Sequence, residues 1–140
     1  MTSCLLRLVQ LRGLIAAIAA LVLAFPGLVW SGQVRERDPK WTAPSEEISR
    51  PNPLAERRET AAGGAKVFQQ RCATCHGADG RGTTKAPDLA APDVHAQTDG
   101  ALFWKISSGN AHAGMPGFSF LPEAQRWQLV LHLRALGTAP

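Results

Sequence analysis

Cys72, Cys75 and His76 are the residues whose types and spacing predict chemistry most directly. Two thiols three positions apart, with a histidine directly after the second, form the pattern for covalent attachment of a c-type haem. Residues i and i+3 lie on one side of a helix or tight turn, so both sulfurs can reach the vinyl groups along one porphyrin edge. The imidazole can then bind the iron as the proximal ligand. We therefore predict one covalent haem c at this motif.

Other uses of a Cys-x-x-Cys pair fit the sequence less well. A zinc site needs a second ligand pair, and the only other cysteine is Cys4. The remaining histidines form no H-x-x-x-H pair: His95, His112 and His132. A thioredoxin-like dithiol would lie near a βαβ pattern, and no strand-rich run precedes the motif. A disulfide between the two thiols would close a very small loop and leave the adjacent histidine unexplained.

Met115 is the second residue with chemical potential, because it lies in a loop of Gly and Pro and not on an apolar helix face. Filling a gap in the core, the ordinary role of methionine, is therefore the weaker interpretation. The residue follows His76 by 39 positions (115 − 76), far enough for the chain to reach the opposite face of a porphyrin. A thioether there would complete a His/Met iron site. His112 in the same loop is the nearest rival ligand.

A helix pattern begins near Ala61 and runs into the cysteine motif. Residues at spacings of 4, 4 and 3 share one of its faces: Gly64, Phe68, Cys72 and Cys75. This face would look toward the haem and a partner helix. A glycine inside a helix costs about 0.5–1 kcal/mol relative to alanine, so Gly64 indicates close approach by another backbone.

Two more helices are expected on the C-terminal side. Thr98 opens a short helix that Gly109 closes, and on it Trp104 either fills the core or donates its indole N–H to a haem propionate. The last helix spans about residues 122–136, with a proline in its first turn. No strand pattern of any length appears. The predicted fold is all-α over residues 61–140, a small core that a covalent haem would complete.

A glycine-rich loop follows the motif, and Pro87 lies a short distance beyond it. A proximal histidine usually donates its other ring N–H to a carbonyl or carboxylate, which sets the orientation of the ring. The carbonyl of Pro87 is the expected acceptor for His76.

The first part of the chain predicts export. Residues 1–31 form a signal peptide or membrane anchor, with two arginines and no acid before an apolar run from Gly13 to Val29. That run of 17 residues (29 − 13 + 1) lies between a signal h-region of roughly 7–15 residues and a spanning helix of about 20. Cleavage near Ser31 is favoured, and anchoring through residues 13–30 stays open. Both outcomes place the haem motif on the exported, periplasmic side.

Residues 32–60 are rich in charge and proline and have few apolar residues to bury. They are expected to form an extended tether or a wrapping arm. Trp41 within them is expected to pack on the domain surface, with a membrane-interface or partner contact as the alternative.

Composition and charge limit the classes of function that the chain can have. Its 140 residues are 45% hydrophobic and 19% charged, which is ordinary for one globular domain with appendages. The net charge of +4 falls to +2 without Arg7 and Arg12, since 13 basic and 11 acidic residues remain. Such a balance gives no support to nucleic-acid binding.

The segment from about Ala61 to Leu136 resembles the class I c-type cytochromes, and most of all the small bacterial monohaem cytochromes. The order of the shared motifs carries the resemblance: Gly64 and Phe68, the Cys72-to-His76 motif, the Pro87-Asp88-Leu89 loop, the Met115-Pro116 loop and the helix from Trp127 to Leu136. It implies a cytochrome c fold of a few helices around one haem c, with His76 and Met115 as iron ligands.

The resemblance also implies that a Pro87 carbonyl lies behind His76 and that the N- and C-terminal helices cross at Gly64 and Phe68. Leu89 and Trp104 join the predicted cofactor-binding residues. One residue departs from the family, which often has tyrosine in the last helix where this chain has His132. We expect His132 to be a half-buried histidine with its hydrogen bonds satisfied, and not a ligand.

The predicted function is that of a one-electron carrier between exported or membrane-bound redox partners, and not of an enzyme. With both axial positions filled by protein, no substrate can bind the iron. The alternative is a haem enzyme or gas sensor that keeps one axial position open for peroxide, CO or NO. A zinc or dithiol binding module is a third hypothesis.

Overall fold

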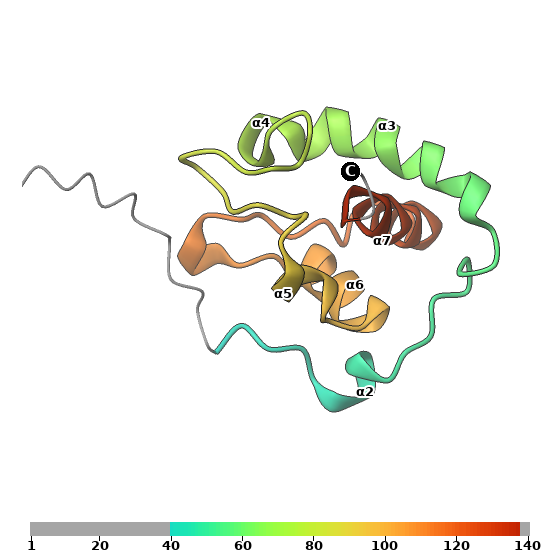
Figure 1. Ribbon diagram of the computed structural model, residues 1–140. Helices are drawn as coiled ribbons and strands as arrows, with labels where there is room; N and C mark the ends of the chain where they lie inside the picture. Colours follow the sequence, from blue (N-terminus) through green and yellow to red (C-terminus); the bar gives the residue numbers. More distant parts are fainter. Residues whose placement is uncertain (1–39, 138–140) are drawn as a thin grey trace, which may run out of the picture. The chain divides into compact units, whose positions relative to one another are not determined.

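The computed structural model describes residues 40–137, and the predicted leader, residues 1–31, lies outside this part (Figure 1). In chain order its helices are α2 (Ser45–Ile48), η1 (Arg58–Thr60), α3 (Ala61–Arg71), α4 (Ala73–His76), α5 (Pro92–His95), α6 (Asp99–Ser108), η2 (Ala111–Ala113) and α7 (Glu123–Gly137). No strand occurs among the described residues, so the prediction of an all-α fold is confirmed. Within residues 40–137, no helix is long and apolar enough to cross a membrane.

Helices α3 and α7 cross at a point where their backbones touch. Gly64 is buried there, and a Cβ built on it would lie 2.0 Å from the carbonyl oxygen of Gln128. Phe68, one turn later on α3, has no exposed surface. The close approach predicted at Gly64 is therefore confirmed, because only a residue without a side chain fits between the two helices.

Helix α6 forms the third side of the core. Thr98 caps it as predicted, with Oγ1 accepting a hydrogen bond from the amide of Ala101 at 3.2 Å. Gly109 ends it with a φ of +66°. Phe103 of α6 stacks on Trp127 of α7, with ring centroids 4.0 Å apart. Such a pair adds about 0.5–1.5 kcal/mol beyond the burial of its area.

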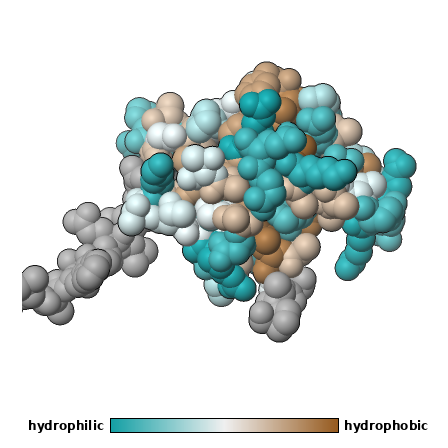
Figure 2. Space-filling model, turned by 90° about the horizontal axis from the view of Figure 1, so that it is seen from above, coloured by the Kyte–Doolittle hydropathy of each residue, from teal (hydrophilic) through white to brown (hydrophobic). Residues whose placement is uncertain are grey.

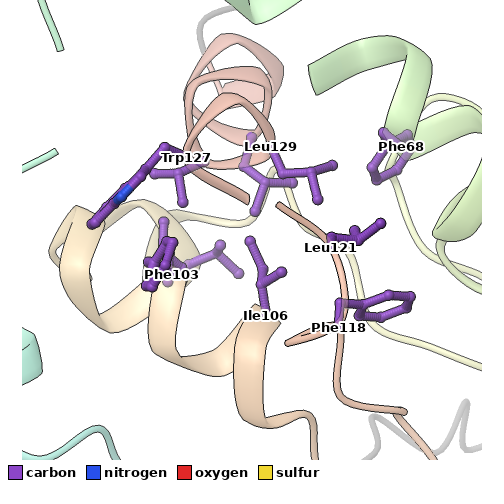
Figure 3. Close-up of a cluster of buried hydrophobic side chains, with 11 residues drawn as sticks. Phe68, Phe103, Ile106, Phe118, Leu121, Trp127 and Leu129 are labelled. Atoms are coloured by element: carbon purple, nitrogen blue, oxygen red, sulfur yellow. The ribbon is translucent and has the colours of Figure 1, made fainter. Parts of the chain in front are cut away.

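The hydrophobic core lies where α3, α6 and α7 meet the segment that leads into α7 (Figure 3). Its buried side chains are Phe68, Val94, Leu102, Phe103, Ile106, Phe118, Leu121, Trp127, Leu129, Val130 and Leu133. On the face seen from above, hydrophilic residues separate several hydrophobic patches, so no single apolar patch covers that face (Figure 2).

The last helix begins and ends one residue later than the predicted span of 122–136. Its Arg134 does more than oppose the helix dipole. The guanidinium donates to the carboxylate of Asp99 at 2.8 Å and to the carbonyls of His95 and Gln97 at 2.9 and 2.6 Å. One side chain thus joins α7 to the connection between α5 and α6.

The described part of the predicted tether, residues 40–60, packs against the helical domain. A Cβ on Gly100 of α6 would lie 1.9 Å from the carbonyl oxygen of Glu47, so α2 touches α6 backbone to backbone. Asn52 is buried and donates to Asp99 at 3.0 Å. We call residues 40–52 the arm. The predicted domain boundaries at 31 and 60 stay predictions.

One arginine of the arm, Arg50, lies over the stacked rings of Phe103 and Trp127. The guanidinium carbon of Arg50 lies 4.6 Å from the ring centroid of Phe103 and 5.3 Å from that of Trp127. Its Nη2 donates to Glu123 at 2.6 Å. The same carboxylate oxygen accepts the indole N–H of Trp127 at 3.2 Å. This network fastens the arm to α6 and α7 at once.

Candidate functional site

The cysteine motif occupies a short helical turn of its own. The predicted continuous helix breaks at Cys72, whose φ of −114° separates α3 from α4. Backbone bonds from the amides of Cys75 and His76 to the Cys72 carbonyl, at 3.1 and 3.0 Å, close the turn. Gly77 ends it at a φ of +82°. The predicted face therefore extends to Cys72, whose amide donates to the Phe68 carbonyl at 2.8 Å and whose side chain packs against the core, but Cys75 is exposed on the next turn.

The two thiols and the imidazole differ in how deeply they are buried. Cys75 is exposed, Cys72 is half-buried, and neither thiol is in a disulfide. His76 is 9% exposed. Burial, and then the neighbouring Cys75, raise the pKa of Cys72 to about 11, so before haem attachment this sulfur carries its proton at neutral pH.

His76 is oriented by the residue that the sequence indicated. Its Nδ1 lies 3.0 Å from the carbonyl oxygen of Pro87. A carbonyl only accepts hydrogen bonds, so Nδ1 carries the proton and Nε2 presents a lone pair. Burial lowers the pKa of His76, and the Pro87 carbonyl opposes that change. Nε2 has no hydrogen-bond partner among residues 40–137. The side chain is thus a neutral imidazole ready to bind a metal.

Gly82 and Thr83 bring Pro87 to this position, and sequence analysis missed both. A Cβ on Gly82, at a φ of +85°, would lie 2.6 Å from the amide nitrogen of Asp88 and 2.8 Å from the Pro87 carbonyl carbon. The amide of Thr83 donates to Ala86 at 2.9 Å, closing the turn before Pro87. The glycine run was the only signal in the sequence for this tight loop.

Met115 lies at the end of a hairpin and is half-buried. It pairs with Asn110 through two backbone hydrogen bonds of 2.9 Å each, and its side chain packs against the hydrophobic core. In Figure 1 this orange hairpin and α4 both lie toward the left of the domain. His112, the rival ligand, is exposed on η2.

Leu89 and Trp104 are half-buried, and Leu89 packs against the core. The indole N–H of Trp104 has no hydrogen-bond partner among the described residues, so it stays available for a ligand such as a propionate. The structure thus places every predicted site residue within residues 40–137.

His132 differs in one respect from its prediction. It is half-buried, as expected, and its ring lies against Phe68. However, Nε2 is buried without a hydrogen-bond partner, so the expectation of a satisfied histidine was wrong. The phenyl ring of Phe68, against which the imidazole packs, offers this nitrogen neither a donor nor an acceptor.

These residues fit a covalently attached haem. The free thiols of Cys72 and Cys75 lie one helical turn apart, and the neutral imidazole of His76 offers a lone pair. The indole N–H of Trp104 has no acceptor among the described residues. No group of three or more His, Cys, Asp or Glu side chains gathers within residues 40–137. A structural zinc site, which takes four such ligands, is therefore not assembled by this part of the chain.

A protein-family model described as cytochrome c oxidase, cbb3-type, subunit III matches residues 59–133. The chain belongs to this family. A search of curated proteins found no match. The family domain is a class I c-type cytochrome domain, which confirms the resemblance seen in the sequence. This member of the cbb3-type subunit III family is therefore a c-type haem protein of electron transfer, and its domain implies covalently bound haem c.

Proposed function

We propose that the protein carries single electrons between redox proteins, with one haem c and with His76 and Met115 as its two axial ligands. When bound, the haem supplies an iron that changes between the ferrous and ferric states. The hydrogen bond from His76 Nδ1 to the Pro87 carbonyl is the observation that carries the proposal, because it directs Nε2 as a fixed lone pair.

The Met115 hairpin supports a sealed iron site and not an open one. The two backbone bonds to Asn110 hold Met115 in one place, and its thioether is a soft ligand that favours the reduced state. Two protein ligands leave no position for peroxide, CO or NO. We therefore propose that the protein is not itself an enzyme.

Proteins are the proposed partners, because His76 and Met115 together would hold the iron closed to small-molecule substrates and leave only the transfer of electrons. The family description supports a place in an oxidase complex. We further propose that the domain lies on the exported, periplasmic side, either free after cleavage near Ser31 or anchored through residues 13–30. The charge and apolar run of the leader support this location.

Two measurements on the purified full chain test this function. The reduced protein is mixed with CO, and absorption spectra report whether the iron binds it. Slow or negligible binding is expected, whereas rapid stoichiometric binding would support the alternative enzyme or gas sensor. Intact mass spectrometry then reports both covalent haem and leader cleavage. A protein that holds zinc and lacks a Soret band would contradict the haem proposal.

A further inference from the structure

We infer that Trp41, in the arm, is a positioning residue for Met115, and this inference rests on the proposed ligation by that methionine. The indole Nε1 of Trp41 donates to the carbonyl oxygen of Gly109 at 2.7 Å, across 68 residues of sequence. Gly109 is the first residue of the Met115 loop, residues 109–118. In Figure 1 the cyan start of the arm and the orange hairpin both lie at the left of the domain.

The two ends of that loop meet at Gly109, which we call the neck. The part before Met115 is the first limb, and the part after it is the second limb. A Cβ on Gly109 would lie 2.4 Å from both the amide nitrogen of Gly117 and the carbonyl carbon of Pro116. Those residues directly follow Met115. The next residue on the first limb, Asn110, forms the paired backbone bonds with Met115. A shift of the Gly109 carbonyl is therefore passed to the Met115 backbone through van der Waals contact and two hydrogen bonds.

The loop is stiff beyond its neck, so a shift there moves it as a unit. Asn110 is 6% exposed, and its side-chain oxygen accepts from the amide of Ala113 at 3.2 Å. On the second limb, the amide of Phe118 donates to the Ile106 carbonyl at 3.0 Å. The second limb is thus bonded to α6, and the Gly109 carbonyl is bonded to the indole of Trp41.

Trp41 is itself held in place. Its ring is half-buried, and the ammonium nitrogen of Lys105 lies 4.6 Å from the ring centroid. The rest of the arm is fastened elsewhere, by Arg50 to Glu123 and by Asn52 to Asp99. Removing only the indole N–H should therefore leave the arm docked, while the Gly109 carbonyl keeps only the longer hydrogen bond from the Ser108 hydroxyl, at 3.3 Å.

The test uses the haem-loaded full chain with the substitution Trp41→Phe, which keeps an aromatic ring beside Lys105 and removes the donor. We expect CO to bind the reduced variant roughly two- to tenfold faster, the factor that loss of one neutral hydrogen bond predicts. The red charge-transfer band of a methionine-ligated ferric haem should weaken, and the reduction potential should fall. Amide exchange of Met115 should accelerate.

Arg50→Gln is the matched control, because it loosens the arm without touching Gly109. It should lower the melting temperature and leave the CO rate, the charge-transfer band and the potential unchanged. Equal effects in both variants would mean general loosening and would overturn the inference. So would a folded Trp41→Phe protein with wild-type values. Absence of the red charge-transfer band in the wild-type protein would instead overturn the proposed ligation by Met115 itself.

Discussion

The imidazole of His132 packs against the phenyl ring of Phe68, with centroids 4.9 Å apart and planes tilted by 54°. This contact joins α7 to α3 at the position where the class I cytochromes often have tyrosine. The chain thus keeps an aromatic contact at the crossing, but it gains a titratable group whose Nε2 is buried and unpartnered.

Burial lowers the pKa of His132 from its ordinary value of 6.5, so the unfolded chain binds the proton more tightly than the folded one. The contribution of His132 to stability is therefore complete above about pH 6.5, and it is lost as the pH falls toward its lower folded pKa. His132→Phe should remove this part of the pH dependence. It should also raise the free energy of unfolding at pH 7.5 by roughly 1 kcal/mol, because an unsatisfied buried nitrogen disappears.

Urea unfolding of the haem-loaded protein at pH 7.5 and pH 5 measures both effects. His112→Gln is the control, since His112 is exposed and its replacement should leave the pH dependence in place. If His132→Phe loses stability between the two pH values as steeply as the wild type, the assignment to His132 is wrong.

Gly64→Ala should separate α3 from α7. The added Cβ would lie 2.0 Å from the Gln128 carbonyl oxygen, which belongs to a helix backbone and cannot move aside. We expect a loss of about 1–3 kcal/mol in the free energy of unfolding from overpacking. That loss exceeds the roughly 0.5–1 kcal/mol gained from helix propensity.

Gly63→Ala is a close control for this substitution. Its Cβ would meet only the end of the Gln128 side chain, with Oε1 at 2.7 Å, and that side chain can turn away. Chemical denaturation should find the Gly63 variant near or above wild-type stability. Equal destabilisation of both variants would show that the backbone contact at Gly64 is not the cause.

Gly82→Ala should disturb His76 without touching it. The new Cβ would push against the backbone of Pro87 and Asp88 and displace the carbonyl that accepts from Nδ1. A weaker hydrogen bond makes the imidazole a poorer donor to ferric iron, so the reduction potential should rise. Redox titration monitored by absorption measures the change.

Gly80→Ala, in the same loop, is the control for Gly82→Ala. Gly80 also has a positive φ, of +73°, but its Cβ would meet the end of the Leu136 side chain instead of the Pro87 backbone. Both variants carry the conformational cost of a left-handed residue, about 1–2 kcal/mol. Only the Gly82 variant should shift the potential, and a shift of equal size in both would refute the role of the Pro87 carbonyl.

Met115→Ala should lower the reduction potential and open the iron to CO. Loss of the thioether removes the ligand that favours ferrous iron, and the fall should be on the order of a tenth of the ~0.8 V that axial ligands span. His112→Ala in the same loop should leave both properties unchanged. Protein-film voltammetry and CO titration check the pair, and an unchanged potential in the Met115 variant would exclude it as a ligand.

Local chemistry in the sequence determined the haem motif, the start of α3 and, to within one residue, the ends of α6 and α7. Cys72, Cys75 and His76 are adjacent in the chain, so their spacing alone specifies the covalent chemistry. Thr98 and Gly109 cap α6 through contacts with their own neighbours. Gly64 was informative for the same reason, because a glycine in a helix pattern has a local cost that only a close neighbour offsets.

Tertiary structure alone decided the contacts between residues that are distant in the chain. The donor for Gly109 is 68 residues away in Trp41, and no periodicity or cap connects the two. The unpartnered nitrogen of His132 depends on which groups surround it at the helix crossing. Gly82 matters because another loop backbone lies against it. Patterns of 3.6 residues and capping residues record short-range geometry, whereas hydrogen bonding across the domain depends on how the helices pack together.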